Sequence, residues 1–250
     1  MLDPTEAAAV AAQFGVGDPE VRRDHLMSHL LGALAGNLAE EVVFLGGTAL
    51  ARTHLPDGRL SEDLDLVARG KRASVASVIE RVLATGARRD YGRLSWQPRL
   101  SAGPDLDSAM LVAADGLAVR VQLLDATHVP PWPTEQRQLL QRYSDAPPTR
   151  LRVPTLASFV ASKTAAWADD RQPRDLYDLW GLASIGAIDE AAQDLYIRLG
   201  PSGEPPGRSL FGEPPDDESW KEQLSGETRL LVGPVEAASQ VRDAWSSLSA

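Results

Sequence analysis

The chain has 250 residues, enough to bury the core of one large domain or of two smaller ones. It contains no cysteine, which excludes disulfide bonds, thiolate metal sites and cysteine catalysis. A formal net charge of −10 argues against a general nucleic-acid-binding protein. The N-terminal residues lack a secretory signal pattern, and no run of about 18 apolar residues occurs, so we expect a cytoplasmic protein without a membrane span.

The charges are unevenly distributed along the chain. Lys71 to Arg99 contains seven basic and two acidic residues, whereas Asp189 to Ala250 contains twelve acidic and five basic residues. A local basic surface in the first half is suited to holding a polyanion such as RNA. The same pattern is equally typical of arginines on solvated helix faces and strand edges.

Residues 3–40 are predicted to be helical. Asp18 followed by Pro19 is typical of a helix start, and this helix is predicted to continue to Leu38. Leucines recur in it at helical spacing and predict a stripe that faces the core: Leu26, Leu30, Leu31, Leu34 and Leu38.

Two histidines lie on the same predicted helix. His25 and His29 are four residues apart, so their side chains share one face, as the side chains of a metal-binding pair would. Because the sequence nearby indicates no third ligand, we interpret both as surface histidines rather than as a metal site.

A glycine turn follows the first predicted strand. The apolar, β-rich run Val42–Leu45 ends at Gly46, Gly47 and Thr48, and a helical pattern comes next. This order of strand, turn and helix start leaves backbone N–H groups unpaired and pointing toward one spot, where they can bind an anion such as phosphate. Taken alone, a glycine pair after a strand is more often an ordinary turn.

Two aspartates lie in the next predicted strand. Asp63 and Asp65 are separated by one residue, so their side chains lie on one face of the strand. Taken alone, such a pair is more often a solvated strand face. If the two strands pair side by side, however, both carboxylates lie next to the glycine turn. Carboxylates beside nucleotide phosphates are suitable ligands for Mg²⁺, so we predict a Mg²⁺-dependent nucleotide site.

Helices and strands are also predicted in the remainder of the chain. The first group comprises a helix over Ala73–Leu83, strands over Arg88–Pro98, Ala109–Ala113 and Leu117–Leu124, and a hairpin turn at Asp115-Gly116. The second group comprises a short helix over Thr134–Tyr143 and helices over Pro154–Ala168, Arg174–Leu182 and Pro234–Leu248, with a flexible connection over Gly200–Pro215.

Two blocks of sequence together carry a family resemblance. The first is GGTAL followed by R-x-SEDLDL, with Gly46, Gly47, Thr48, Arg59, Ser61, Glu62, Asp63 and Asp65 as the matching residues. The second has the pattern K…R…RDLYDL, formed by Lys163, Arg171 and the run Arg174–Leu179. These blocks resemble the AbiEii/AbiGii toxin family of the polymerase-β-like nucleotidyltransferase superfamily. The resemblance covers Val42–Val67 and Pro154–Leu182 and is weak elsewhere.

The resemblance implies an α+β fold, with a nucleotidyltransferase-like mixed β-sheet, flanking helices and a C-terminal helical region. We expect a nucleotidyltransferase core with N-terminal helices over residues 1–125. A proline-rich connecting segment is expected over residues 126–150 and a helical region that completes the active-site cleft over residues 151–250.

Nucleotidyl transfer requires a neutralised triphosphate, an aligned nucleophile and charge stabilisation on the leaving pyrophosphate. We assign Asp63 and Asp65 to Mg²⁺ and count Asp63 as catalytic. Lys163 is assigned to the triphosphate as a flexible point charge. Asp178, which resembles a catalytic acid of the family, would orient Lys163 or the acceptor hydroxyl. The nucleotide-binding candidates are Gly46, Gly47, Thr48, Ser61, Arg52, Arg171 and Arg174.

Structural explanations compete with two of these assignments. Lys163 would also be unremarkable as a surface lysine. Arg174 and Asp178 are four residues apart, so they would also be compatible with an ordinary ion pair within one helix.

One departure from the superfamily lies on the predicted strand Leu117–Leu124, where a third carboxylate is commonly found. The matching position is Gln122. Its neutral amide cannot take up a proton and is a weaker Mg²⁺ ligand than a carboxylate. Asp125 lies three residues further along and would replace it only if the strand bends. This departure supports one alternative, a non-catalytic module that binds nucleotide.

The resemblance implies a toxin of a toxin–antitoxin system, which transfers a nucleotide from a nucleoside triphosphate to an RNA acceptor. In some relatives this acceptor is the 3′ end of tRNA. The implied partner is a cognate antitoxin, and in some systems the antitoxin modifies a serine near the aspartate pair, where Ser61 lies. The other alternative is an antibiotic-modifying, aminoglycoside-type nucleotidyltransferase, because a cationic substrate suits the acidic second half. The RDLYDL block favours the toxin.

Overall fold

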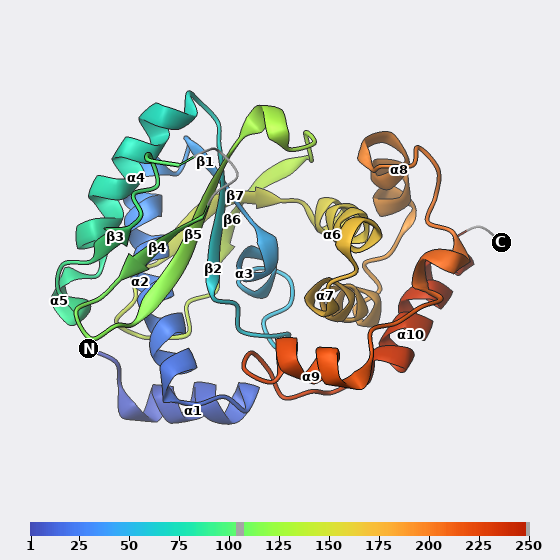
Figure 1. The fold of residues 1–250 in the computed structure, drawn as a ribbon, viewed down its shortest axis with the longest axis horizontal. Coiled ribbons are helices and arrows are strands. Elements are labelled where there is room, and N and C mark those ends of the chain that lie inside the picture. Colours follow the sequence, from blue (N-terminus) through green and yellow to red (C-terminus); the bar gives the residue numbers. More distant parts are fainter. Residues whose placement is uncertain (104–107, 249–250) are drawn as a thin grey trace. The chain divides into compact units, whose positions relative to one another are not determined.

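The computed structural model describes residues 1–103 and 108–248 (Figure 1). The chain divides into two compact units. The first unit consists of Met1–Val129 and Thr134–Val153, and the second consists of Pro130–Pro133 and Pro154–Ala250. Among the described helices, none is both long enough and apolar enough to cross a membrane.

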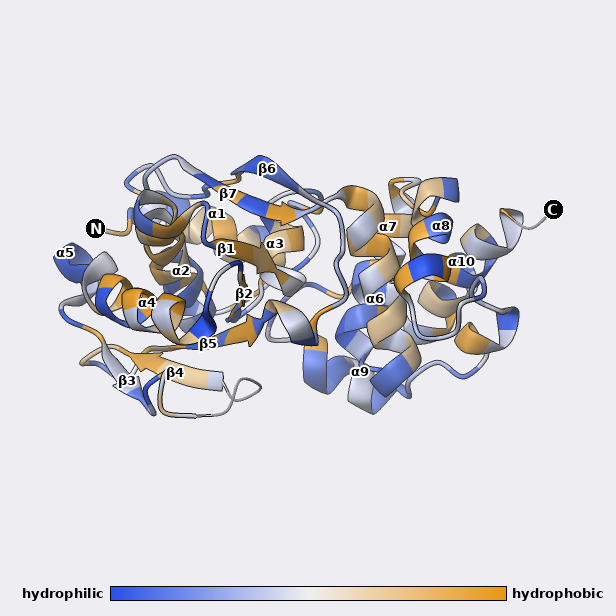
Figure 2. Cartoon of the chain, turned by 90° about the horizontal axis from the view of Figure 1, so that it is seen from above, coloured by the Kyte–Doolittle hydropathy of each residue, from blue (hydrophilic) through white to orange (hydrophobic). Residues whose placement is uncertain are grey.

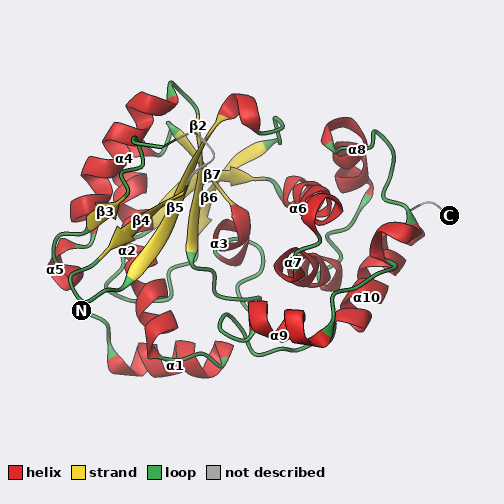
Figure 3. Cartoon of the chain, viewed as in Figure 1, coloured by secondary structure: helices red, strands yellow, loops and turns green. Residues whose placement is uncertain are grey.

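The first unit is built on a mixed β-sheet, drawn as yellow arrows in Figure 3. Within the described residues the strand order is β3-β4-β5-β2-β1-β7-β6. The strands are β1 (Val42–Leu45), β2 (Asp63–Ala68), β3 (Ser95–Gln97), β4 (Ser108–Val112), β5 (Ala118–Asp125), β6 (Thr134–Leu139) and β7 (Thr149–Pro154). β2 pairs antiparallel with β1 and parallel with β5, so the aspartate pair lies in the middle of the sheet.

Helices cover both faces of this sheet (Figure 1). They are α1 (Pro4–Phe14), α2 (Asp18–Leu38), α3 (Gly46–Ala51), α4 (Arg72–Gly86) and the single turn α5 (Arg88–Tyr91), followed later by the 3₁₀ turn η1 (Ala126–His128). The leucine stripe of α2 is buried, as predicted. A Cβ at Gly86 of α4 would lie 2.7 Å from the Cβ of Ala33, so this glycine allows α2 and α4 to pack closely. This mixed sheet with flanking helices confirms the predicted fold class.

The second unit is helical. It contains α6 (Leu156–Asp170), α7 (Pro173–Ser184), α8 (Glu190–Leu199), the 3₁₀ turn η2 (Arg208–Phe211), α9 (Asp217–Leu224) and α10 (Pro234–Ser247). Large aromatic side chains fill its core. The rings of Trp167 and Phe211 stack with centroids 6.4 Å apart, and Trp220 and Trp245 are also buried. These contacts fix the helices that carry the second sequence block.

Two predicted elements are wrong. Thr134–Tyr143 is not a helix, because Thr134–Leu139 forms the edge strand β6 beside β7. Figure 2 shows β6 in blue, so its polar side chains suit a solvated sheet edge, and pairing with β7 overrides their helix propensity. Arg88–Pro98 is not one strand either. Its first residues form α5, which ends at Gly92 with a positive φ of 69°, and only Ser95–Gln97 are extended.

The interpretation of His25 and His29 as surface histidines is also wrong. The side chain of His25 is fully buried, and that of His29 is 12% exposed. The fold brings Asp145, which lies 120 residues beyond His25 in the chain, within 3.1 Å of His25 Nε2. Nothing near α2 in the sequence indicates this third group, because Asp145 belongs to the connection between β6 and β7.

Candidate active site

The glycine turn and the aspartate pair lie next to each other in the first unit. Leu45 is opposite Asp65 in the antiparallel pairing of β1 and β2, and Gly46 follows immediately. Gly46 has a φ of +79°, a conformation that glycine adopts without penalty. A Cβ there would collide with the Asp65 carboxylate and lie 3.1 Å from its Cγ. The two features therefore touch, as required if one nucleotide is to contact both.

Thr48 connects the same two segments. Its side chain is buried, and its hydroxyl donates a hydrogen bond of 2.5 Å to the backbone carbonyl of Asp63. The hydroxyl hydrogen is therefore used to position the start of β2. The backbone N–H groups of the first turn of α3, by contrast, have no acceptors within the helix and are suited to an anion.

Two arginines that received no role from the sequence lie at this site. Arg59 is buried, and a Cβ at Gly47 would lie 3.1 Å from its guanidinium carbon. Arg120 donates from Nε to Asp63 Oδ1 at 2.8 Å, and its terminal nitrogen contacts the other oxygen of the same carboxylate. The hydrogen bond to Asp63 raises the pKa of Arg120. The alternating faces of the predicted strand already placed Arg120 beside Gln122, but only the strand register pairs it with Asp63.

The strand register also locates the position of the expected third carboxylate. In the parallel pairing of β2 and β5, Gln122 is opposite Asp65, whereas Asp125 is opposite Ala68 at the far end of β2. Asp125 accepts hydrogen bonds from the backbone N–H of Thr127 at 3.0 Å and from its hydroxyl at 2.7 Å. The bond from the Thr127 N–H lowers the pKa of Asp125. Asp125 therefore caps the turn η1, and Gln122 occupies the position beside the aspartates.

Arg52 does not lie at this site. Its side chain is 1% exposed and donates to Asp24 Oδ1 at 2.7 Å and to the Leu140 carbonyl at 3.1 Å. These contacts make it part of the core that joins α2 and α3 to β6. Ser61 is half-buried in the loop before β2, next to Glu62, whose carboxylate lies 2.7 Å from Arg23.

The second sequence block forms a charged cluster in the helical unit. Lys163 of α6 places its Nζ 2.7 Å from Asp175 Oδ1 and 2.7 Å from Asp178 Oδ2, both on α7. The three side chains are largely buried, with 12%, 15% and 5% of their areas exposed. Sequence reasoning paired Lys163 with Asp178 and missed Asp175, although the spacing of three residues on α7 already placed both carboxylates on one face.

Arg171 and Arg174 have contacts of their own in the helical unit. Arg171 ends α6 in the left-handed conformation with a φ of 56°, and its guanidinium lies 5.3 Å from the centre of the Trp167 ring. Arg174 Nε is 3.1 Å from Glu227 Oε1. Arg171 is exposed and accessible to an anion, whereas Arg174 anchors α7 to the segment after α9.

Comparison with known proteins identifies a family. The family model described as "Nucleotidyl transferase AbiEii toxin, Type IV TA system" matches residues 29–245. No curated protein matches the chain. MenT4, a nucleotidyltransferase toxin from Mycobacterium tuberculosis H37Rv, has a similar structure, with a TM-score of 0.72 and 22% identity over 97% of this chain and 89% of that chain. An antigenic nucleotidyltransferase-like protein from Paracoccidioides brasiliensis gives a TM-score of 0.41 and 13% identity over 68% and 78% of the two chains.

The similarity to MenT4 confirms the nucleotidyltransferase-like fold. The family match includes the glycine turn, the aspartate pair and the Lys163 cluster, and so confirms the resemblance carried by the two sequence blocks. The chain therefore belongs to the AbiEii nucleotidyltransferase toxin family of type IV toxin–antitoxin systems.

Proposed function

We propose that this toxin transfers a nucleotide from a nucleoside triphosphate to an RNA acceptor, the 3′ end of tRNA, in the cytoplasm. The observation that carries the proposal is the contact between Gly46 and the Asp65 carboxylate, which leaves no room for a side chain at residue 46. The contact brings the N–H groups of the turn and the carboxylates to one place. A nucleoside triphosphate needs both, because it presents phosphate oxygens and a bound cation together.

The residues at the site fit a magnesium ion. Asp63 and Asp65 lie on one face of β2 and offer hard carboxylate oxygens, and Gln122 adds a neutral amide opposite Asp65. When bound there, Mg²⁺ would neutralise phosphate charge and polarise the phosphorus under attack. Phosphates and water would supply the remaining ligands, since Mg²⁺ is commonly held by only one or two protein carboxylates.

The protein's own residues would bind and orient the nucleotide. We assign the N–H groups of Gly46, Gly47 and Thr48 to the phosphate oxygens. Arg120 holds the Asp63 carboxylate in a two-point contact and so restricts its orientation before the nucleotide binds. A carboxylate whose orientation is already restricted loses less conformational freedom on binding a ligand.

In the helical unit we assign Lys163 to the triphosphate and Asp178 to positioning Lys163. The support is the 2.7 Å contact between Lys163 Nζ and Asp178 Oδ2, in which the carboxylate is almost fully buried. An ion pair with a buried carboxylate limits the rotamers of the lysine. We assign the exposed Arg171 as an additional anion contact. Arg174 is assigned as a weaker anion contact, because it pairs with Glu227.

Support for an RNA acceptor comes from the basic segment Lys71–Arg99. Arg72 is buried and donates from Nε to the Leu123 carbonyl at 2.8 Å, so its role is structural. The other basic residues of the segment are exposed: Lys71, Arg81, Arg88, Arg89, Arg93 and Arg99. They provide positive charge that a polyanion can contact even though the whole chain is acidic.

The test is a transfer assay with labelled nucleoside triphosphates, Mg²⁺ and total RNA. Wild type is compared with Asp63→Asn and Lys163→Ala, and Asp125→Asn serves as the matched control because its carboxylate caps η1. We expect label in tRNA with wild type and Asp125→Asn and at least about 100-fold less with Asp63→Asn. Transfer that survives Asp63→Asn would reject the metal assignment, and label in another RNA would reject the tRNA assignment.

The antitoxin partner can be tested at Ser61. Some relatives resembling this chain carry a serine near the aspartate pair that the antitoxin modifies, and Ser61 is half-buried two residues before Asp63. We propose that the cognate antitoxin modifies Ser61, and a group added there would lie close to both carboxylates and oppose nucleotide binding. Expression of the toxin should arrest growth, and co-expression of the neighbouring antitoxin should relieve the arrest for wild type but not for Ser61→Ala.

A second candidate is a module that binds nucleotide without turnover. Two observations favour it, namely Gln122 opposite Asp65 and the pairing of Asp63 with Arg120. This candidate predicts Mg²⁺-dependent binding of a nucleoside triphosphate, no pyrophosphate release with any RNA, and no growth arrest.

A further inference from the structure

Three side chains that commonly bind metals converge in the first unit, and none belongs to the candidate active site. His25 Nε2 lies 3.3 Å from His29 Nε2 and 3.1 Å from Asp145 Oδ1. His29 Nε2 lies 3.7 Å from the same carboxylate oxygen. A tetrahedral zinc ion with bonds of about 2.0–2.1 Å separates its ligand atoms by about 3.3 Å. The three atoms are therefore already spaced like three corners of one zinc site.

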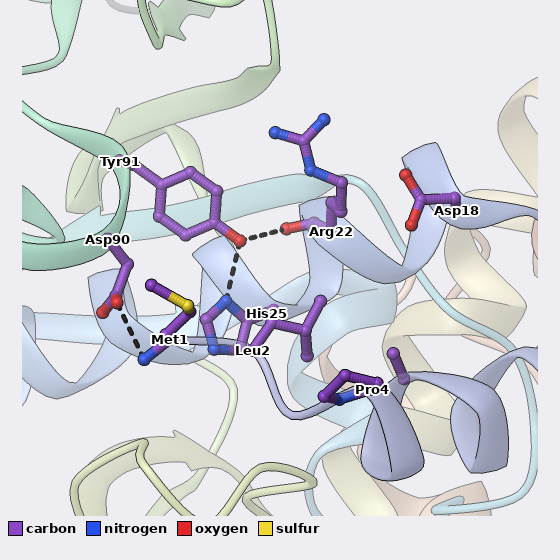
Figure 4. A pocket seen from close by; sticks show the side chains of 9 residues that line it. Met1, Leu2, Pro4, Asp18, Arg22, His25, Asp90 and Tyr91 are labelled. Atoms are coloured by element: carbon purple, nitrogen blue, oxygen red, sulfur yellow. Dashed lines mark hydrogen bonds and ion pairs between the residues drawn. The ribbon is translucent and has the colours of Figure 1, made fainter.

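Hydrogen bonding orients the buried histidine so that its ligand atom faces the group. Figure 4 shows Tyr91 between His25 and Arg22. The Tyr91 hydroxyl donates to the Arg22 carbonyl at 3.0 Å, so its oxygen is left to accept from His25 Nδ1–H at 2.7 Å. A neutral His25 then has its lone pair on Nε2, directed at Asp145. Metal-binding histidines are usually fixed by such a bond from the other ring nitrogen.

This arrangement requires a proton or a metal ion between the facing acceptors. A lone pair on His25 Nε2 that faces a carboxylate at 3.1 Å is repulsive unless a proton or a metal ion lies between them. The α-ammonium of Met1 also contacts this group, 2.6 Å from Asp145 Oδ2 and 2.8 Å from Asp90 Oδ1. A divalent cation bound to the three side chains would take the place of the proton between His25 and Asp145.

A cavity reaches one of the three ligands, His25, and the neighbouring carboxylate of Asp90. It has a volume of about 460 Å³ and is lined by His25, Asp90 and Tyr91, among other residues (Figure 4). Asp90 Oδ2 lies 3.9 Å from His29 Nε2, so a second carboxylate is close to the remaining coordination position. Either Asp90 or a water molecule from the cavity can complete a four-coordinate site.

We propose that His25, His29 and Asp145 bind one Zn²⁺ ion. Two imidazole nitrogens and one carboxylate oxygen suit zinc and the similar Co²⁺, whereas Mg²⁺ prefers oxygen ligands alone. Both histidines belong to α2, and Asp145 belongs to the connection between β6 and β7. The ion would therefore fasten this connection to α2, and it is independent of the Mg²⁺ proposed at Asp63 and Asp65.

The test uses the full chain after removal of metals with EDTA and dialysis. Titration with ZnCl₂ at about pH 7.5 is followed by calorimetry, and CoCl₂ is followed by visible absorption. We expect one tight Zn²⁺ per chain and the strong absorption of tetrahedral Co²⁺. His29→Gln should weaken Zn²⁺ binding by at least about 100-fold and abolish the Co²⁺ band, because a direct ligand matters more than an outer-shell partner, whose loss costs about 10–100-fold.

Control variants separate this site from other histidines and from the active site. His128→Gln removes an exposed histidine on η1 and should bind Zn²⁺ like wild type. Asp63→Asn should retain the tetrahedral Co²⁺ band even if transfer activity is lost. Circular dichroism verifies that His29→Gln is folded, and if it is not, Asp145→Asn and Tyr91→Phe replace it, with expected losses of about 100-fold and 10-fold. Absence of stoichiometric binding in wild type, or equal binding in the ligand variants, would overturn the proposal.

Discussion

Replacing Gly46 with alanine tests the contact on which the proposed function depends. Two penalties follow from the structure. An alanine at residue 46 would be held in the left-handed backbone region, at a φ of +79°, which costs about 1–2 kcal/mol. Its Cβ would also collide with the Asp65 carboxylate and lie 3.1 Å from Asp65 Cγ, so the carboxylate must move away. Displacing a packed group costs about 1–3 kcal/mol more, and we expect a total loss of unfolding free energy of about 2–5 kcal/mol.

Gly116→Ala is the matched control for this prediction. Gly116 lies in the hairpin between β4 and β5 with a φ of +88°, and a Cβ there has no neighbour within 4 Å among the described residues. The unfolding free energy of Gly116→Ala should fall by only about 1–2 kcal/mol, the cost of holding an alanine in the left-handed conformation. Urea denaturation measures both losses, and Mg²⁺-dependent binding of a nucleoside triphosphate measures the effect on the site. If Gly46→Ala matches Gly116→Ala in stability and still binds nucleotide like wild type, the turn and Asp65 do not form one site.

Three further changes test other parts of the structure. Asp24→Asn should lower the unfolding free energy by about 3–5 kcal/mol, because it leaves the buried Arg52 without its carboxylate, and a loss below about 1 kcal/mol in urea denaturation would contradict this. Lys163→Gln should reduce nucleotide transfer at least tenfold and Lys163→Arg should restore part of it, whereas equal activity of the two variants would show that the charge facing Asp178 is unimportant. Burial lowers the pKa of His54 below its ordinary value of 6.5, so its stabilising contribution is present above that pH and is lost as the pH falls. His54→Gln should therefore reduce the fall in the urea midpoint between about pH 7.5 and 5.5. An unchanged fall would show that His54 does not contribute to this pH dependence.

The core of the candidate site was predictable because local patterns determine it. A period of two places Asp63 and Asp65 on one strand face, and the same period places Arg120 with Gln122 on β5. The adjacency of the glycine turn required only that consecutive strands pair, as β1 and β2 do.

Features that depend on distant segments were not predictable in this way. The partner of Asp63 is set by the parallel register of β2 and β5, which no local pattern specifies. Thr134–Leu139 reads as a helix in isolation and becomes a strand because β7 offers it a free edge. Arg52 was a candidate for binding phosphate, yet its contacts with Asp24 and Leu140 hold it inside the protein.

The pairing of β2 with β5 also bears on how the proposed Mg²⁺ would enter the site. The two aspartates lie with the Arg120 guanidinium and the Gln122 amide, and the buried Arg59 guanidinium lies beside Gly47, so their two negative charges are offset, unlike the three of a carboxylate triad. A lone Mg²⁺ ion would give up costly hydration to enter and would gain little from a group whose negative charges are already offset. The triphosphate would contribute the missing anionic oxygens. If the proposed function is correct, we expect occupancy by Mg²⁺ to rise with nucleotide concentration, because the two would bind together as one chelate.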